Sequence, residues 1–279
     1  MNQHNISKIS FCLPSASSIK KGKESVINNI TRLIQDDEQI GFAGYLRRRD
    51  LRRDLYPFIF GISEKVNLPD LKKDEVKIQK IIQNVVKKCQ SYYTKIPPLN
   101  IFVFPTQDPF VLKEMRGING FAPHKRTIHL YVNPNINIGW PKNLSLTVAH
   151  EIAHAISYEQ FEWRTLLDSL IFEGLAEHFR EQIIDGGKAP WTAATTKEYA
   201  LFIIKKLEEE NLLESNDNDL YLDLFFGGER FLKWSGYTIG YIIVQTILKY
   251  GNFKVIDLLQ TPPDMIYMLY KRTVQRKTR

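Results

Sequence analysis

Apolar residues recur at helical spacing through the first third of the chain. The run at 24–39 places its apolar residues on one face, and the run at 74–93 does the same with lysines on the opposite face. A further helix is expected at 45–56, before Pro57 and Gly61 interrupt it. We therefore predict a helical N-terminal region over residues 1–96, with a polar, serine-rich and loosely ordered start at 1–22.

The period changes after Pro97-Pro98. Residues 99–104 are rich in β-formers and are followed by a proline. Residues 127–133 form a second expected strand, with apolar residues at alternate positions. Residues 117–122 are open to two interpretations, an extended segment or a flexible rim. We expect a small sheet within 99–134, and the pattern leaves open which strand lies at its edge.

Helical periodicity returns in the second half of the chain. The first helix is introduced by Trp140-Pro141, since proline suits a first turn, and a later one by the capping-box pattern Thr195-Thr196-Lys197-Glu198. The stretch at 220–234 is aromatic and has no clear assignment. The expected helices span about 144–158, 166–184, 195–213 and 235–251, with a short last one after Pro263. The predicted fold class is α+β.

Composition bounds the kind of protein. With 279 residues and 43% hydrophobic content, the chain can bury a sizeable core and is not a disordered protein. No apolar run reaches the length of a membrane span, and the N-terminus has no signal-peptide core. The widely spaced Cys12 and Cys89 are expected to be reduced. These features favour the cytoplasm.

Positive charge is concentrated at one place. The net charge is +7, and residues 47–53 hold five arginines. A nucleic-acid or anionic-surface role is one interpretation. We favour a solvated helix face with Asp50 and Asp54 as counter-charges, because no nucleic-acid-binding motif accompanies the run.

Candidate chemistry lies within the expected helix at 144–158. The pattern H-E-x-x-H spans His150, Glu151 and His154. Two histidines four residues apart share a helix face, so both can bind one zinc ion (Zn²⁺). Glu151 then lies beside the ion, where a carboxylate can act as general base on a metal-activated water.

A second signal follows downstream. Glu173 lies 19 positions after His154, and Glu177 lies one turn further on the same helix face. Glu173 at this separation suits a third metal ligand. By contrast, His124 and His129 lack ligand spacing, and His178 should point away from the metal.

These residues resemble those of the gluzincin metallopeptidases, whose third ligand is a glutamate on the helix after H-E-x-x-H. The segment 172–176, Phe-Glu-Gly-Leu-Ala, is similar to the Asn-Glu-Gly-Phe-Ala of aminopeptidase N-like enzymes. Together the motifs look most like the YjaZ-type family of predicted zinc-dependent proteases. The resemblance implies a zincin-like fold, a catalytic domain over 97–279, and a peptide or protein substrate that adds a strand to the sheet edge.

Two more residues gain roles from this resemblance. Thermolysin-like relatives carry a carboxylate four residues after the glutamate ligand, which implies that Glu177 orients His150. The Tyr-x-x-Gly opening of the apolar helix at 235–251 resembles the segment that supplies a catalytic tyrosine. Tyr237 is therefore expected to donate a hydrogen bond to the oxyanion, with Tyr241 as the reserve.

One departure limits the resemblance, and one rival function stays open. The Gly-x-Met-Glu-Asn segment that recognises a free amino terminus in aminopeptidases has no counterpart before His150, since 117–120 lacks its glutamate. This favours an endopeptidase or a processing enzyme. The rival is a non-catalytic, zinc-stabilised scaffold or regulator descended from a peptidase, although retention of Glu151 counts against it.

Overall fold

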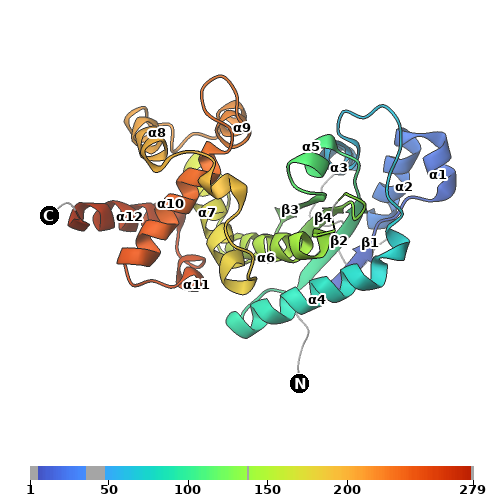
Figure 1. Ribbon diagram of the computed structural model, residues 1–279, viewed down its shortest axis with the longest axis horizontal. Coiled ribbons are helices and arrows are strands. Elements are labelled where there is room, and N and C mark those ends of the chain that lie inside the picture. The colour runs from blue at the N-terminus through green and yellow to red at the C-terminus, as the bar shows by residue number, and fades with distance from the viewer. Residues whose placement is uncertain (1–5, 36–47, 137, 278–279) are drawn as a thin grey trace. The chain divides into compact units, whose positions relative to one another are not determined.

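A computed structural model describes residues 6–35, 48–136 and 138–277 of the chain (Figure 1). The chain forms two compact units, Met1–Ala155 and Ile156–Arg279. The division that we expected between residues 96 and 97 lies inside the first unit. It remains a prediction about where the catalytic part begins.

The first unit is built around a four-stranded mixed sheet. Its strands are β1 (Ile6–Phe11), β2 (Leu99–Pro105), β3 (Ile118–His124) and β4 (Thr127–Val132), in the order β1-β2-β4-β3. The first three in that order are parallel, and β3 runs antiparallel to β4. The expected sheet at 99–134 is confirmed, and β3 is one of its edges.

Strand β1 was not predicted, and the expectation of a loosely ordered start over residues 6–22 is wrong. Its six residues alternate weakly and include Lys8 and Ser10, so the sequence shows little β signal. Its stability comes from parallel pairing with β2, which lies about ninety residues away along the chain. Helix α1 (Ala16–Lys21) follows it, with Ser15 as N-cap.

One face of the sheet is aromatic. Phe102, Phe104 and Tyr131 project from β2 and β4 into a core shared with α2 (Lys23–Gln35) and α3 (Arg48–Phe60). The rings of Phe58 and Tyr131 stack with centroids 4.9 Å apart. These helices match the expected periodicity, although 36–39 and 45–47 of the predicted ranges lie outside the described residues.

Helix α3 continues through Pro57, so the predicted break there is wrong. A proline lacks one N–H and crowds the preceding turn, which disfavours a helix here. The buried Leu55 and Ile59 on either side of it hold the segment in the core as a helix. The helix ends at Gly61, whose N–H donates to the Pro57 carbonyl and whose φ of 54° suits glycine. In the part of the arginine run that can be described, Arg52 pairs with Glu24, and Arg53 lies 3.0 Å from Asp54. These ion pairs agree with a solvated helix face.

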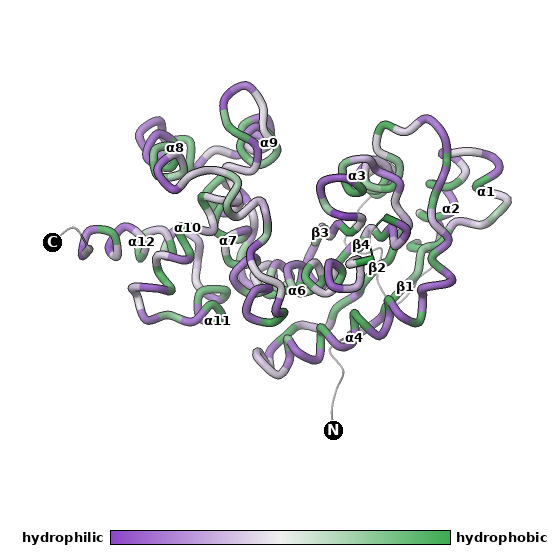
Figure 2. Tube along the Cα trace, viewed as in Figure 1, coloured by the Kyte–Doolittle hydropathy of each residue, from purple (hydrophilic) through white to green (hydrophobic). Residues whose placement is uncertain are grey.

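Helix α4 (Glu75–Tyr92) matches the predicted amphipathic helix and runs beside β1 (Figure 1). Figure 2 shows hydrophilic and hydrophobic residues alternating along it. Its buried face includes Cys89, and neither Cys89 nor the buried Cys12 forms a disulfide. Burial raises the pKa of Cys89 to about 12, so its thiol is unreactive near neutrality. Two short helices also belong to this unit, η2 (Leu71–Lys73) and α5 (Pro109–Lys113).

Helix α6 (Trp140–Tyr158) begins four residues before its expected start. Pro141 lies in the first turn, where its missing N–H costs nothing. From Val148 onward nearly every residue is buried, which explains why the helix is apolar around most of its circumference.

The second unit is helical and is centred on the pair α7 (Leu166–Ile183) and α10 (Ser235–Tyr250). Gly174 and Gly240 face each other where the two helices pack, and a Cβ on Gly174 would lie 3.1 Å from the Gly240 Cα. The remaining elements are η3 (Pro190–Ala193), α8 (Lys197–Glu209), α9 (Asn218–Phe226), α11 (Val255–Leu258) and α12 (Pro263–Lys277). The last helix is longer than expected, and α9 occupies the stretch that the sequence left unassigned. Within the described residues, no helix is both long enough and apolar enough to cross a membrane.

Candidate metal centre

His150 and His154 lie one turn apart on α6, as their spacing predicts. Their Nε2 atoms are 3.0 Å apart, and the ring planes are inclined at 82°. His154 is buried at 5% exposure, while His150 is half-buried. The helix therefore aims two imidazole nitrogens at one point beside its surface.

This pair fits a zinc ion. Two nitrogens at Zn–N distances of about 2.0–2.1 Å around a tetrahedral ion would be roughly 3.3 Å apart, close to the separation found. Burial, and then the neighbouring His150, holds the pKa of His154 well below its usual range. The ring is therefore neutral near pH 7, which is the protonation state that binds a metal.

Glu173 of α7 lies close enough to be a third donor. Ligand atoms of His150, His154 and Glu173 all lie within 4.8 Å of one another. The Glu173 side chain is 6% exposed, so it contributes a carboxylate shielded from water. Two imidazoles and one carboxylate are a donor set typical of catalytic zinc, which keeps a fourth position open.

The start of α7 explains how Glu173 is held. Thr165 and Asp168 form a reciprocal capping box at its N-terminus. The indole of Trp163 donates a 2.7 Å hydrogen bond to Ser169 Oγ, and its ring packs between Tyr158 and Phe172. The short connection from α6 to α7 is thus fixed by its own side chains.

Glu151 follows His150 on α6 and lies against the edge strand β3. Its side chain is 5% exposed. A Cβ built on Gly120 would lie 2.5 Å from its Cγ and 2.7 Å from its Cδ. The carboxylate therefore reaches the backbone of β3 at a position where any side chain would displace it. The sequence analysis missed Gly120 because a glycine in a strand has several common explanations.

The two candidate tyrosines have different surroundings. The Tyr241 hydroxyl donates to Glu181 Oε2 at 3.0 Å, and its pKa is raised by burial and then by that carboxylate. Tyr237 is half-buried and packs edge-on against Phe225, with Trp191 on another side. The Tyr241 hydroxyl is therefore committed to Glu181, and the role of Tyr237 at the oxyanion remains a prediction.

Glu177 lies at the centre of a buried polar cluster. Its carboxylate accepts from Arg180 Nε at 2.5 Å and from Trp191 Nε1 at 2.9 Å. Both Glu177 and Arg180 are buried, so this ion pair is fully desolvated. The expected role in orienting His150 remains a prediction.

The other histidines have structural surroundings. His129 is fully buried between Phe102 and Phe104, and burial lowers its pKa to about 3. His178 stacks on the Tyr241 ring at 4.1 Å and donates to its carbonyl. Neither His124, His129 nor His178 belongs to the cluster of potential metal ligands. The prediction that His178 is structural agrees with this packing.

Tyr221 of α9 was not predicted from the sequence. It is half-buried, and its pKa is raised by burial, then by the nearby charge of Glu173. Its ring stacks on Phe225, which also packs against Tyr237. The stretch around it carried no periodic signal, so only the fold brings this phenol close to the glutamate.

Comparisons with known proteins agree with the donor set. A family model described as "Predicted Zn-dependent protease (DUF2268)" matches residues 77–268. Two proteins of Bacillus subtilis (strain 168) are similar in sequence, and both are described as uncharacterized. YjfC is 25% identical over 163 residues, covering 54% of each chain. YjaZ is 28% identical over 141 residues, covering 48% of this chain and 52% of its own.

The chain therefore spans about half the length of these curated relatives. No solved structure matches it. The comparisons thus support membership of this family and the binding of zinc, and they do not identify a substrate.

Proposed function

This chain belongs to the Predicted Zn-dependent protease family, and from that premise we propose that it hydrolyses peptide bonds in a peptide or protein substrate. The main supporting observation is that ligand atoms of His150, His154 and Glu173 lie within 4.8 Å of one another. Glu151 is adjacent to His150 on α6. The proposed enzyme is of the gluzincin type with a zincin-like fold.

The three donors would hold one zinc ion. When bound, zinc supplies Lewis-acid chemistry, lowering the pKa of a water ligand to about 7 and polarising a carbonyl oxygen. The neutral, buried His154 and the shielded Glu173 carboxylate would hold the ion in a position protected from bulk water.

Glu151 is the proposed general base. Its carboxylate would take the proton from the attacking water and then give that proton to the leaving amine. Burial between α6 and β3 holds the side chain in one place, which favours both transfers. Tyr237 would donate a hydrogen bond to the oxyanion, and Glu177 would orient His150.

The substrate backbone is proposed to lie along β3. This strand is an edge of the sheet, so one side of its backbone is not paired with another strand of that sheet. An extended peptide could add to it by main-chain hydrogen bonds. Because Glu151 lies against Gly120 in the middle of β3, a peptide paired there would pass beside the proposed base.

The rival is a zinc-stabilised scaffold without catalysis. It requires the same three ligands but gives no reason for a buried carboxylate at Glu151. A purely structural site also commonly closes its fourth position with another protein ligand. Among the described residues, three potential ligands lie together, His150, His154 and Glu173, and no fourth accompanies them.

A peptide-cleavage screen tests the proposal. The zinc-loaded chain is incubated with a diverse peptide library, and the cut sites are read by mass spectrometry. Glu151→Gln serves as the matched control, because it keeps the side-chain shape without a basic carboxylate. Cuts made by the wild type and absent from the control are expected. Zinc-loaded protein that cuts no member of the library, or equal cutting by both proteins, would favour the scaffold.

A further inference from the structure

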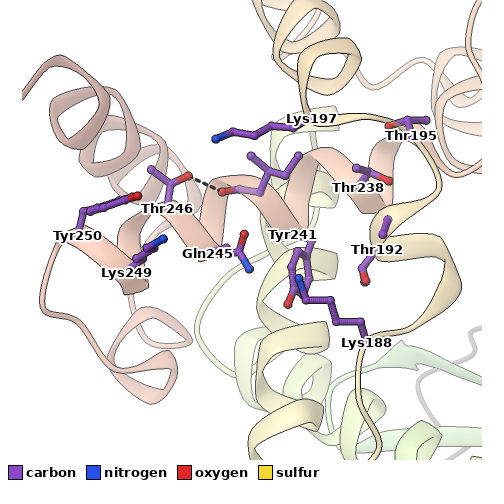
Figure 3. A pocket seen from close by; sticks show the side chains of 12 residues that line it. Lys188, Thr192, Thr195, Lys197, Thr238, Tyr241, Gln245, Thr246, Lys249 and Tyr250 are labelled. Carbon is purple, nitrogen blue, oxygen red and sulfur yellow. Dashed lines mark hydrogen bonds between the residues drawn. The ribbon is translucent and has the colours of Figure 1, made fainter. Parts of the chain in front are cut away.

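A cavity of about 250 Å³ lies in the second unit, walled by α10 on one side and by residues 188–197 on the other (Figure 3). Figure 3 shows Tyr241, Gln245 and Lys249 on successive turns of α10, with Lys188 extending across the Tyr241 ring. The Lys188 ammonium lies 4.9 Å from the centre of that ring. The cavity contains none of the proposed metal ligands.

The lining is positively charged. It includes Lys188, Lys197 and Lys249 and contains no aspartate or glutamate. Within the described residues, none of these three lysines forms an ion pair, although other lysines of α8, such as Lys205 and Lys206, do.

Glu181, which is not part of the lining, offsets some of this positive charge. Glu181 of α7 accepts a hydrogen bond from the Tyr241 hydroxyl and interacts electrostatically with Lys188. The lining itself has three lysines and no acid, so Glu181 offsets only part of its positive charge. The cavity therefore has a net positive potential, which raises the local concentration of anions.

Hydrogen-bonding groups accompany the charge. The Thr195 hydroxyl is buried and has no partner among the described residues, although most buried hydroxyls have one. The Gln245 amide also lines the cavity and offers two further donors. These groups suit a ligand that carries several oxygen acceptors.

We propose that this cavity binds the phosphate group of a small molecule. A phosphate carries a charge of about −1.5 to −2 at neutral pH and presents three or more acceptor oxygens, which matches three lysines beside neutral donors. Lysine binds phosphate as a point charge, whereas arginine binds phosphate or carboxylate in a bidentate geometry. The lining contains no arginine.

The size agrees with a small ligand. Pockets for drug-sized molecules have volumes of roughly 300–1,000 Å³, so this cavity fits a phosphate and a short attached group. Inorganic phosphate and a phosphate monoester share the recognising chemistry. The proposal does not depend on proteolysis.

Calorimetric titration of the full chain tests it. Inorganic phosphate and glycerol 3-phosphate are titrated at constant ionic strength, because screening at about 0.15 M acts over roughly 8 Å. The test variant is Lys188→Gln/Lys197→Gln/Lys249→Gln. The matched control, Lys80→Gln/Lys87→Gln/Lys88→Gln, makes the same charge change on the exposed face of α4.

The test variant should raise the dissociation constant of both probes by about tenfold or more, with the control unchanged. Tighter binding of the monoester would identify an organic phosphate as the ligand, and equal binding would identify the free ion. Equal loss in both triple variants, or no binding by the wild type, would overturn the proposal. So would binding abolished by His150→Ala and kept in the test variant, because the phosphate would then lie at the metal centre.

Discussion

At the scale of single residues, Glu151 is the proposed general base. Glu151→Gln preserves shape and burial but removes the base, because an amide does not accept a proton near neutrality. Zinc content should stay at the wild-type level, while kcat on a cleaved peptide falls by about 10²–10⁴-fold. Turnover and elemental analysis are measured on the same preparations. A variant with full activity would show that another group takes the proton.

Gly120 is expected to matter because of what it lacks. In Gly120→Ala the new methyl group would displace the Glu151 carboxylate, which contacts that position. A displacement of about 1 Å can cost 10²-fold, so kcat should fall by roughly that factor with little change in KM. Asn119→Ala, the neighbouring change on β3, is the control. Equal kcat in Gly120→Ala and the wild type would mean that the carboxylate position is not critical.

Tyr237 is the proposed hydrogen-bond donor to the oxyanion. Tyr237→Phe removes one donor and keeps the ring contacts with Phe225 and Trp191. If the hydroxyl stabilises the oxyanion, kcat drops by about 10²–10³-fold and zinc content does not change. Tyr241→Phe should lose mainly the hydrogen bond to Glu181. A kinetic defect confined to Tyr241→Phe would reverse the two assignments.

The proximity of the candidate ligands could be predicted from residue spacing, whereas their surroundings could not. Spacing along one helix determines which side chains share a face, so His150 and His154 were predictable. Gly120 and Tyr221 approach Glu151 and Glu173 only through packing between segments far apart in the chain. No local pattern contains that information.

At the scale of elements, the pair α7 and α10 depends on close backbone approach. A Cβ on Gly240 would lie 3.0 Å from the Leu170 carbonyl carbon and nearer still to its oxygen, so Gly240→Ala must push the helices apart. Such overpacking typically costs about 1–3 kcal/mol. We expect a lower melting temperature and reduced zinc affinity, since Glu173 adjoins the contact at Gly174.

Lys249→Ala is the control on the same helix, because an exposed change there should stay within about 0.5 kcal/mol. Thermal unfolding followed by circular dichroism compares the two variants. If Gly240→Ala unfolds at the temperature of Lys249→Ala, the helices do not need this close contact.

Long helices with regular apolar spacing were the most predictable elements. α4, α6 and α7 were expected within a few residues of their bounds, because one face of each is continuously buried. β1 and α9 were not, since a six-residue strand and an aromatic nine-residue helix depend on tertiary contacts. The break expected at Pro57 is absent because buried residues on both sides of the proline hold the helix against the core.

At the scale of the whole molecule, the sequence predicted the α+β class but not the arrangement of the sheet. Alternation identified β2 and β4, yet it carries no information on which strand is the edge or that β1 joins the other side. The antiparallel edge strand β3 beside Glu151 is therefore a result of the fold. It gives the proposed base and the proposed substrate strand a common location.

The most direct test of the central claim is the zinc content of the purified chain and its ligand variants. Elemental analysis should find about one zinc per wild-type chain, because three donors converge on one point. His154→Ala and Glu173→Gln should each lose most of that metal, while Glu177→Gln should weaken affinity by about 10–100-fold. A wild-type chain without zinc after metal loading, or His154→Ala and Glu173→Gln variants with full zinc content, would contradict the account.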